Sequence, residues 1–291
     1  MIKLGKIFDA LEKSNKENNV SASTEKAARF KVYDRVNDRK VKKKEASRVI
    51  NKVFTNKGID KNMVSLLEPQ SFEAEQFKHL RTNILFPVSG KPPRLIMVTS
   101  ALPNEGKSFV SANLAVSIAQ NINEHVLLID CDVRCPSIHN SFGFGDMPGL
   151  SEYLNKDTPL SSLLLKTEIN KLTILPGGIP PENPAELMSS NQMAELLEEI
   201  KSRYSDRYII VDSPPPNLTS ETNVIARQVD GILLVVKAGS TRREMVGDLI
   251  EMMGKEKVLG VVMNWFDMSS ATYHGYGHEK YSQFGKYYGK S

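Results

Sequence analysis

Short apolar segments recur along most of the chain and alternate with amphipathic ones. Six apolar runs, each ending in polar or glycine-rich residues, occupy 94–100, 125–132, 172–178, 208–216, 231–239 and 258–265. Helical periodicity precedes or separates several of them, at 75–84, 108–120, 190–203 and 240–253. Strands that are apolar on both faces and alternate with helices are typical of a parallel sheet covered on both sides. The pattern therefore predicts an α/β fold with a mostly parallel central sheet flanked by helices.

The two ends of the chain lack this alternation. Four apolar residues near the start fall on one helical face: Leu4, Ile7, Phe8 and Leu11. Residues 15–48 are polar and rich in lysine, a composition that does not build a core. The final stretch mixes glycine, charge and tyrosine without any period. We therefore expect a basic extension with a short amphipathic helix and a flexible linker (1–62), a folded domain (63–265) and a disordered tail (266–291).

Charge is distributed unevenly between these parts. The formal net charge is +4, but residues 1–65 hold 17 Lys/Arg against 8 Asp/Glu, so the rest of the chain is acidic. The basic end is suited to an anionic membrane, a nucleic acid or an acidic partner. No apolar run approaches the roughly 18 residues that a membrane span needs, and no secretory signal begins the chain. With only Cys131 and Cys135, we expect a cytoplasmic protein with reduced thiols.

The first apolar run leads into "ALPNEGKS", residues Ala101–Ser108. This segment matches the phosphate-loop pattern G-x-x-x-x-G-K-[S/T] except that Ala101 replaces the first glycine. It lies between a predicted strand and a predicted helix, as that loop requires, so backbone N–H groups and the helix N-terminus would bind phosphate. We expect Lys107 to reach the β- and γ-phosphates and Ser108 to bind Mg²⁺. The expected nucleotide contacts are Asn104, Glu105, Gly106, Lys107, Ser108 and Phe109, together with Arg134 and Asn264 further along the chain.

Two further strand ends carry aspartate. "LLIDCDVR" places Asp130, Asp132 and Arg134 after one apolar run, and "IIVDSPP" places Asp212 after another. A lone aspartate here is more often a helix N-cap, but parallel strands bring their carboxyl ends to one edge of the sheet. We therefore expect a Mg²⁺–nucleotide site in which Ser108, Asp132 and Asp212 hold the metal. Alternation along an extended segment would point Asp130 and Asp132 the same way.

These motifs, in this order, resemble those of the bacterial tyrosine kinases. The resemblance covers roughly residues 63–265 and includes "GLSEYL" (149–154), "LPGG…NPAELM" (175–188) and "VDGILLVVKAGST" (229–241). It implies an ATP- and Mg²⁺-dependent protein-tyrosine kinase in which Asp130 activates the tyrosine hydroxyl, with Lys107, Asp132 and Asp212 completing the catalytic set. It also implies autophosphorylation in trans of a C-terminal cluster, here Tyr273, Tyr276, Tyr281, Tyr287 and Tyr288.

The resemblance extends to partners. In that family an E-x-x-R-x-x-R helix mediates ring assembly, and here Glu75, Lys78 and Arg81 occupy it, with lysine replacing the first arginine. Lysine keeps the charge but loses the bidentate fork. A homo-oligomer, a separate membrane-bound chain-length regulator of exopolysaccharide or capsule export, and a cognate tyrosine phosphatase are implied. The protein would then sit at the inner membrane through its partner. No nucleic acid is expected, because the basic run at 39–48 lacks interleaved aromatic residues.

Two other functions share these motifs. A regulatory ATPase of the partitioning or septum-positioning kind carries a signature lysine five residues before the phosphate-loop lysine, and Leu102 stands there. A nucleotide-binding adaptor without transfer activity fits less well, because the catalytic set is intact. After the last strand, Asn264 looks like the base-reading residue of related ATPases. Trp265 is expected either to stack nearby or to lie in the core.

Overall fold

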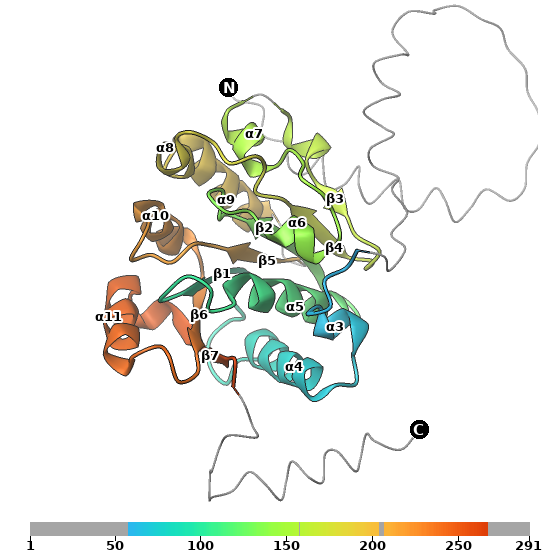
Figure 1. Ribbon diagram of the computed structural model, residues 1–291, viewed down its shortest axis with the longest axis vertical. Helices are drawn as coiled ribbons and strands as arrows, with labels where there is room; N and C mark the ends of the chain where they lie inside the picture. Colours follow the sequence, from blue (N-terminus) through green and yellow to red (C-terminus); the bar gives the residue numbers. More distant parts are fainter. Residues whose placement is uncertain (1–57, 157, 204–206, 267–291) are drawn as a thin grey trace, which may run out of the picture.

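A computed structural model gives the structure of the chain and describes residues 58–156, 158–203 and 207–266. The predicted helix at 1–14, the linker and the tail tyrosines lie outside the described residues. A seven-stranded sheet runs through the domain in the order β3-β4-β2-β5-β1-β6-β7 (Figure 1). All neighbouring strands are parallel except β3 and β4, which are antiparallel. The structure confirms the predicted mostly parallel α/β fold.

The six predicted apolar runs all form strands. They are β1 (Leu95–Ser100), β2 (His125–Asp130), β4 (Leu172–Leu175), β5 (Arg207–Asp212), β6 (Gly231–Lys237) and β7 (Val258–Asn264). The remaining strand, β3 (Leu165–Lys166), has two residues and is too short to leave an alternating signal. Several strands end earlier than their apolar runs suggested, because the residues that follow turn away to form the loops of the site.

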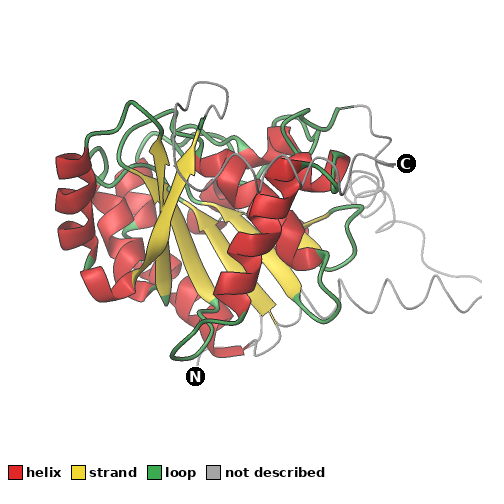
Figure 2. Cartoon of the chain, turned by 90° about the horizontal axis from the view of Figure 1, so that it is seen from below, coloured by secondary structure: helices red, strands yellow, loops and turns green. Residues whose placement is uncertain are grey.

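Helices cover both faces of the sheet (Figure 2). One face carries α3 (Val64–Leu67), α4 (Phe72–Leu85), α5 (Lys107–Ala119) and α6 (Ile138–Ser141). The other carries α7 (Leu150–Leu154), α8 (Pro184–Met188), α9 (Asn191–Arg203), α10 (Ser220–Gln228) and α11 (Arg243–Met253). Alternate residues of β1 join different cores: Leu95 and Met97 pack under α9 and α10, whereas Ile96 and Val98 pack under α5. Burial on both sides explains why the strands are continuous apolar runs.

The segment before α4 is hydrogen-bonded to α5 and α6. The Asn113 side chain accepts a hydrogen bond from the Ser65 N–H (2.9 Å) and donates one to the Asn62 carbonyl (3.0 Å). The Asp60 N–H donates to the Ser141 carbonyl at 3.1 Å. Packing therefore begins a few residues before position 63, where the folded domain is expected to start.

The strand order decides where the site lies. β5 lies between β1 and β2, so the loop after β1 and the aspartates after β2 and β5 meet at one edge of the sheet. Ligands of open α/β sheets bind at this carboxyl edge, where strand order changes direction. Within the described ranges, no helix has the length and apolar character required to cross a bilayer.

Candidate functional site

The phosphate loop is shaped by two residues in the left-handed region of backbone space. Asn104 has φ 61° and Gly106, directly before α5, has φ 93°. The positive φ of Gly106 favours glycine, and a Cβ there would also collide with the side-chain amide of Asn264. The Asn264 amide donates to the Glu105 carbonyl at 2.8 Å. Asn264 thus helps to hold the phosphate loop in place. Its contact with the base of a nucleotide stays a prediction.

Glu105 tethers the loop to a distant part of the chain. Its side chain is buried and accepts hydrogen bonds from the Leu102 N–H (2.9 Å), the Lys237 N–H (3.3 Å) and the Thr241 hydroxyl. The carboxylate therefore turns toward the loop after β6, and only the backbone of Glu105 remains available to a nucleotide. Trp265 is 63% exposed, so its placement in the core is wrong. The stacking alternative for Trp265 stays a prediction.

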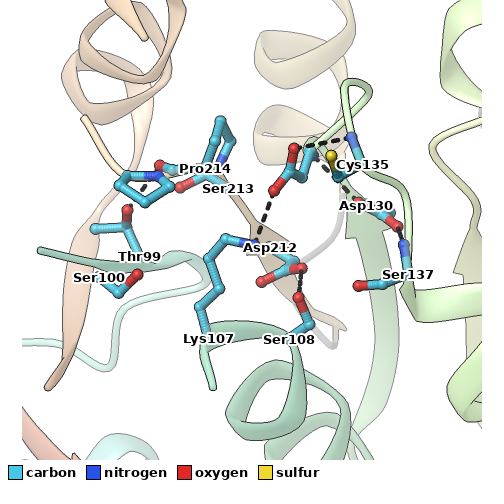
Figure 3. Close-up of polar contacts among 12 residues, drawn as sticks. Thr99, Ser100, Lys107, Ser108, Asp130, Cys135, Ser137, Asp212, Ser213 and Pro214 are labelled. Carbon is cyan, nitrogen blue, oxygen red and sulfur yellow. Dashed lines mark hydrogen bonds and ion pairs between the residues drawn. The ribbon is translucent and has the colours of Figure 1, made fainter. Parts of the chain in front are cut away.

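The first turn of α5 meets the end of β5 (Figure 3). The Ser108 hydroxyl donates to Asp212 at 2.6 Å, and the Ser111 hydroxyl donates to its other oxygen at 3.0 Å. Asp212 is fully buried, and burial raises its pKa although the Lys107 charge opposes that rise. Ser111 is a site residue that the sequence pattern missed. It lies one helical turn after Lys107, a spacing that places both on one helix face.

Lys107 pairs with a second carboxylate. Its ammonium lies 2.8 Å from an Asp132 oxygen. Burial alone would lower the pKa of Lys107, but the charges of Asp212 and Asp132 outweigh burial, and the pKa is raised. The lysine is therefore held charged at the helix start, as phosphate binding requires.

Asp130 is enclosed by the loop that follows it. One carboxylate oxygen accepts from the Asp132 N–H (3.1 Å), and the other accepts from the N–H groups of Ser137 (2.9 Å) and Ile138 (3.1 Å). The side chain is fully buried, and burial, followed by the charge of Asp212, raises its pKa to about 7. β2 ends at Asp130, so strand alternation does not continue to Asp132, and the two carboxylates have different partners.

A cavity of about 530 Å³ opens between these elements. Five of the predicted nucleotide-contact residues in the loop line it, together with Asp132 and Arg134: Asn104, Gly106, Lys107, Ser108 and Phe109. Neither Asp130 nor Glu105 lines it. The remaining lining residues, which the sequence did not assign to the nucleotide site, are Pro103, Cys135, Ser137, Pro214, Pro215, Leu218 and Thr219. Arg134 donates to Glu221 at 2.9 Å, a carboxylate that is 2% exposed.

The donor set fits a hard cation beside phosphate. Ser108, Asp132 and Asp212 offer only oxygen ligands, which Mg²⁺ prefers. Burial raises the pKa of Asp212, and a cation bound beside it would favour the charged carboxylate. Both cysteine thiols are free, as expected, with Cys131 buried and Cys135 exposed at the cavity.

Comparisons with known proteins place the chain in a family. A family profile described as "ParA: NUBPL iron-transfer P-loop NTPase" matches residues 92–291. The tyrosine-protein kinase YwqD of Bacillus subtilis (strain 168) is 36% identical over 220 residues, covering 75% of this chain and 92% of YwqD. The tyrosine-protein kinase CpsD of Streptococcus agalactiae is 36% identical over 206 residues, covering 70% and 88%.

A solved structure agrees with these relatives. The kinase domain of the Escherichia coli tyrosine kinase ETK superposes with a TM-score of 0.66 at 30% identity, covering 74% of this chain and 84% of that one.

The chain belongs to the bacterial tyrosine-protein kinases.

Within the P-loop NTPases of the ParA type, this bacterial tyrosine kinase therefore has the expected fold and loop order. Relatives differ in length. In the tyrosine-protein kinase wzc of Salmonella typhimurium, 32% identical over 235 residues, the matched region is 32% of that protein.

The three residues predicted for oligomerisation lie together on α4, within the bacterial tyrosine kinase domain. The Lys78 ammonium pairs with Glu75 at 2.6 Å and donates to the Pro69 carbonyl at 2.7 Å. Arg81 donates to the Ser117 carbonyl in the last turn of α5 at 2.9 Å. Each of the three side chains thus makes a polar contact within its own chain. An interface through α4 stays a prediction.

Proposed function

We propose that the protein is an ATP-dependent protein-tyrosine autokinase that phosphorylates the tyrosines of its own C-terminal segment in trans. One observation carries the proposal: the phosphate loop and the Lys107–Asp132 pair line a single cavity, and Ser108 in that lining donates to Asp212 at the end of β5. Membership in the tyrosine kinase family supplies the reaction type. Five tyrosines between residues 273 and 288 supply acceptors in the same chain.

Each residue has a distinct task in the transfer. Lys107 and the N–H groups at the start of α5 bind the β- and γ-phosphates and stabilise the charge that develops on them. Ser108, Asp132 and Asp212 would hold Mg²⁺, which when bound neutralises charge on the phosphate oxygens. Lys107 exchanges its contact with Asp132 for the phosphates, and this exchange frees the carboxylate for the metal.

Transfer joins the tyrosine oxygen to the γ-phosphorus and breaks the bond from that phosphorus to the bridging oxygen of ADP. The phenolic proton passes to Asp130, whose pKa of about 7 suits a general base at neutral pH. Because Asp130 is fully buried, the loop from Asp132 to Ser137 must shift for a tyrosine to reach it. The apolar wall of Pro214, Pro215 and Leu218 offers a surface for the phenol ring.

The wider setting follows the family resemblance. The kinase would act in exopolysaccharide or capsule production, next to the inner membrane, with a separate membrane-bound chain-length regulator and a tyrosine phosphatase as partners. Neighbouring subunits would present their C-terminal segments to one another in a ring-shaped oligomer that uses Glu75, Lys78 and Arg81. An α4 interface has to share or replace the bonds that Lys78 and Arg81 make within the chain.

A mixing experiment tests transfer between chains. A Lys107→Met chain, which keeps all tail tyrosines, is incubated with Mg-ATP and a chain whose five tail tyrosines are phenylalanine. The proposal predicts phosphotyrosine on the Lys107→Met chain. If that chain stays unlabelled while wild-type labelling proceeds at a fractional rate independent of concentration, transfer occurs within one chain. ATP hydrolysis without any phosphotyrosine would instead favour a regulatory ATPase.

A further inference from the structure

Two stretches near the site have no part in the proposed transfer, namely residues 149–154 and 175–178. The structure places them against each other. The Leu150 N–H donates to the Pro176 carbonyl at 2.7 Å, and the Ser151 N–H donates to the Gly177 carbonyl at 3.0 Å. The first turn of α7 thus binds the turn that follows β4. Because β4 pairs with β2, in the register Ile129 with Leu175, that turn lies beside Asp130.

Three glycines at this contact leave no space for a side chain. A Cβ on Gly149 would collide with the Pro176 carbonyl, and a Cβ on Gly178 would collide with the Ser151 hydroxyl and the Glu152 carboxylate. We call Gly149, Gly177 and Gly178 the glycine clamp. Only Gly178 has a positive φ, of 90°, so the other two are needed for close approach and not for backbone conformation.

Glu152 holds the two sides of the glycine clamp together by hydrogen bonds. Its carboxylate accepts hydrogen bonds from the Gly149 N–H (2.6 Å), the Ser151 hydroxyl (3.0 Å) and the Ile179 N–H (3.2 Å). These donors come from the first stretch and from the residue directly after the second, so one side chain links the start of α7 to the end of the turn. Charge-assisted bonds of this kind are among the stronger polar contacts in proteins.

Gly177 brings the clamp to the reacting group. A Cβ at this position would lie 2.9 Å from the Pro136 Cβ and 3.4 Å from the Asp130 Cγ. Pro136 belongs to the loop that encloses Asp130 and carries Asp132 into the cavity. A side chain at position 177 would therefore displace Pro136, and with it the loop and the Asp130 carboxyl. The phosphate loop, between β1 and α5, lies on the other side of β5 and is not displaced in this way.

We propose that Gly177 is a positioning residue, which sets the place of the Asp130 carboxyl and of the loop from Asp132 to Ser137 for phosphoryl transfer. This inference rests on the proposed kinase function. Gly177 does not line the cavity, and its lack of a side chain leaves the space beside Pro136 and Asp130 free, so it acts through these two residues. Displacements of about 1 Å at reacting groups typically slow catalysis about 100-fold.

The test compares Gly177→Ala with Gly145→Ala in the full chain. Gly145 precedes α7 and has open space around its Cα, so alanine there adds a methyl group without a collision. We expect Gly177→Ala to lower kcat for autophosphorylation about 10- to 100-fold, to move the pH–rate profile, and to weaken Mg-ATP binding by a much smaller factor, because the displaced loop carries Asp132 while the phosphate loop stays in place. Gly145→Ala should match the wild type in all three. A Glu152→Gln variant, which unlocks the clamp without adding atoms beside Asp130, should move the pH profile in the same direction by less.

A second readout keeps the inference separate from the kinase function. The Asp130 carboxyl is titrated by NMR in the Mg²⁺-free protein, with Asp130→Asn used to assign its signal. A displaced titration midpoint in Gly177→Ala, and none in Gly145→Ala, supports the positioning role even if the wild type transfers no phosphate, an outcome that would refute only the proposed function. An active wild type with an unchanged midpoint and pH profile in Gly177→Ala would overturn the inference. If Gly177→Ala does not fold, the titration midpoint and the pH–rate profile are measured in Glu152→Gln, and the same outcomes support or overturn the inference.

Discussion

The buried carboxylates at the strand ends should make the empty protein less stable as pH rises. Burial first, and the neighbouring Asp212 charge second, raise the pKa of Asp130 from 3.8 to about 7. A folded-state pKa above the unfolded one means that the folded chain holds this proton more tightly. The stability that Asp130 contributes is therefore greatest below about pH 4, falls as pH rises through the window from about 4 to 7, and stays low above it.

The size of this effect follows from the same two pKa values. The full shift corresponds to about 4 kcal/mol at pH 8, of which somewhat more than half develops between pH 5 and pH 8. Asp130 and Asp212 titrate as a pair, so part of the change belongs to both residues. We expect about 2 kcal/mol of stability to be lost between pH 5 and pH 8 because of Asp130.

Urea unfolding of the Mg²⁺-free, nucleotide-free protein measures this loss. Wild type and Asp130→Asn are compared at pH 5 and at pH 8. Asparagine also disturbs the bonds to Ser137 and Ile138, but that penalty is independent of pH and cancels in the difference. The wild type should lose about 2 kcal/mol more than the variant between the two pH values. Equal pH dependence in the two proteins would show that Asp130 does not titrate in this range.

Other predictions concern neighbouring parts of the structure. Glu105→Ala leaves the Leu102 and Lys237 N–H groups without their acceptor and should cost about 2–4 kcal/mol in urea unfolding, against no measurable change for the exposed control Glu198→Ala. Lys107→Met should abolish phosphotyrosine and weaken ATP binding, whereas Asp130→Asn should abolish phosphotyrosine and largely spare ATP binding; wild-type phosphotyrosine in either variant contradicts the site. Arg81→Glu should shift sedimentation toward smaller species in a salt-dependent manner, and an unchanged profile rules out α4 as the interface. We also expect the apolar face of residues 1–14 to dock on a partner protein or the inner membrane leaflet; deleting residues 2–14 should then reduce membrane co-fractionation in cells, and unchanged fractionation would refute this docking.

The sheet and the edge where the site lies could be predicted because burial on both faces makes each strand a continuous apolar run. The meeting of Ser108 with Asp212 follows from parallel topology, since Asp212 ends β5 and the loop after the neighbouring β1 brings Ser108 to the same edge of the sheet. Helix α10 was not predicted, because its nine residues give too few turns for a clear period.

Side-chain directions inside the site were beyond the sequence pattern. Glu105 turns away from the cavity because its partner Thr241 lies 136 residues further along the chain. Asp130 and Asp132 diverge because the strand ends between them, a boundary that apolar patterning does not define. The glycine clamp depends on two loops that meet only in the folded domain, so its glycines look like ordinary turn residues in the sequence.

The most direct measurement of the central claim is the intact mass of the purified full chain before and after incubation with Mg-ATP, followed by peptide mapping, with Lys107→Met as the matched control. The account predicts successive phosphate additions on tyrosines between residues 273 and 288 in the wild type and none in Lys107→Met. Hydrolysis of ATP with an unchanged mass, or phosphate confined to residues outside that segment, would contradict it.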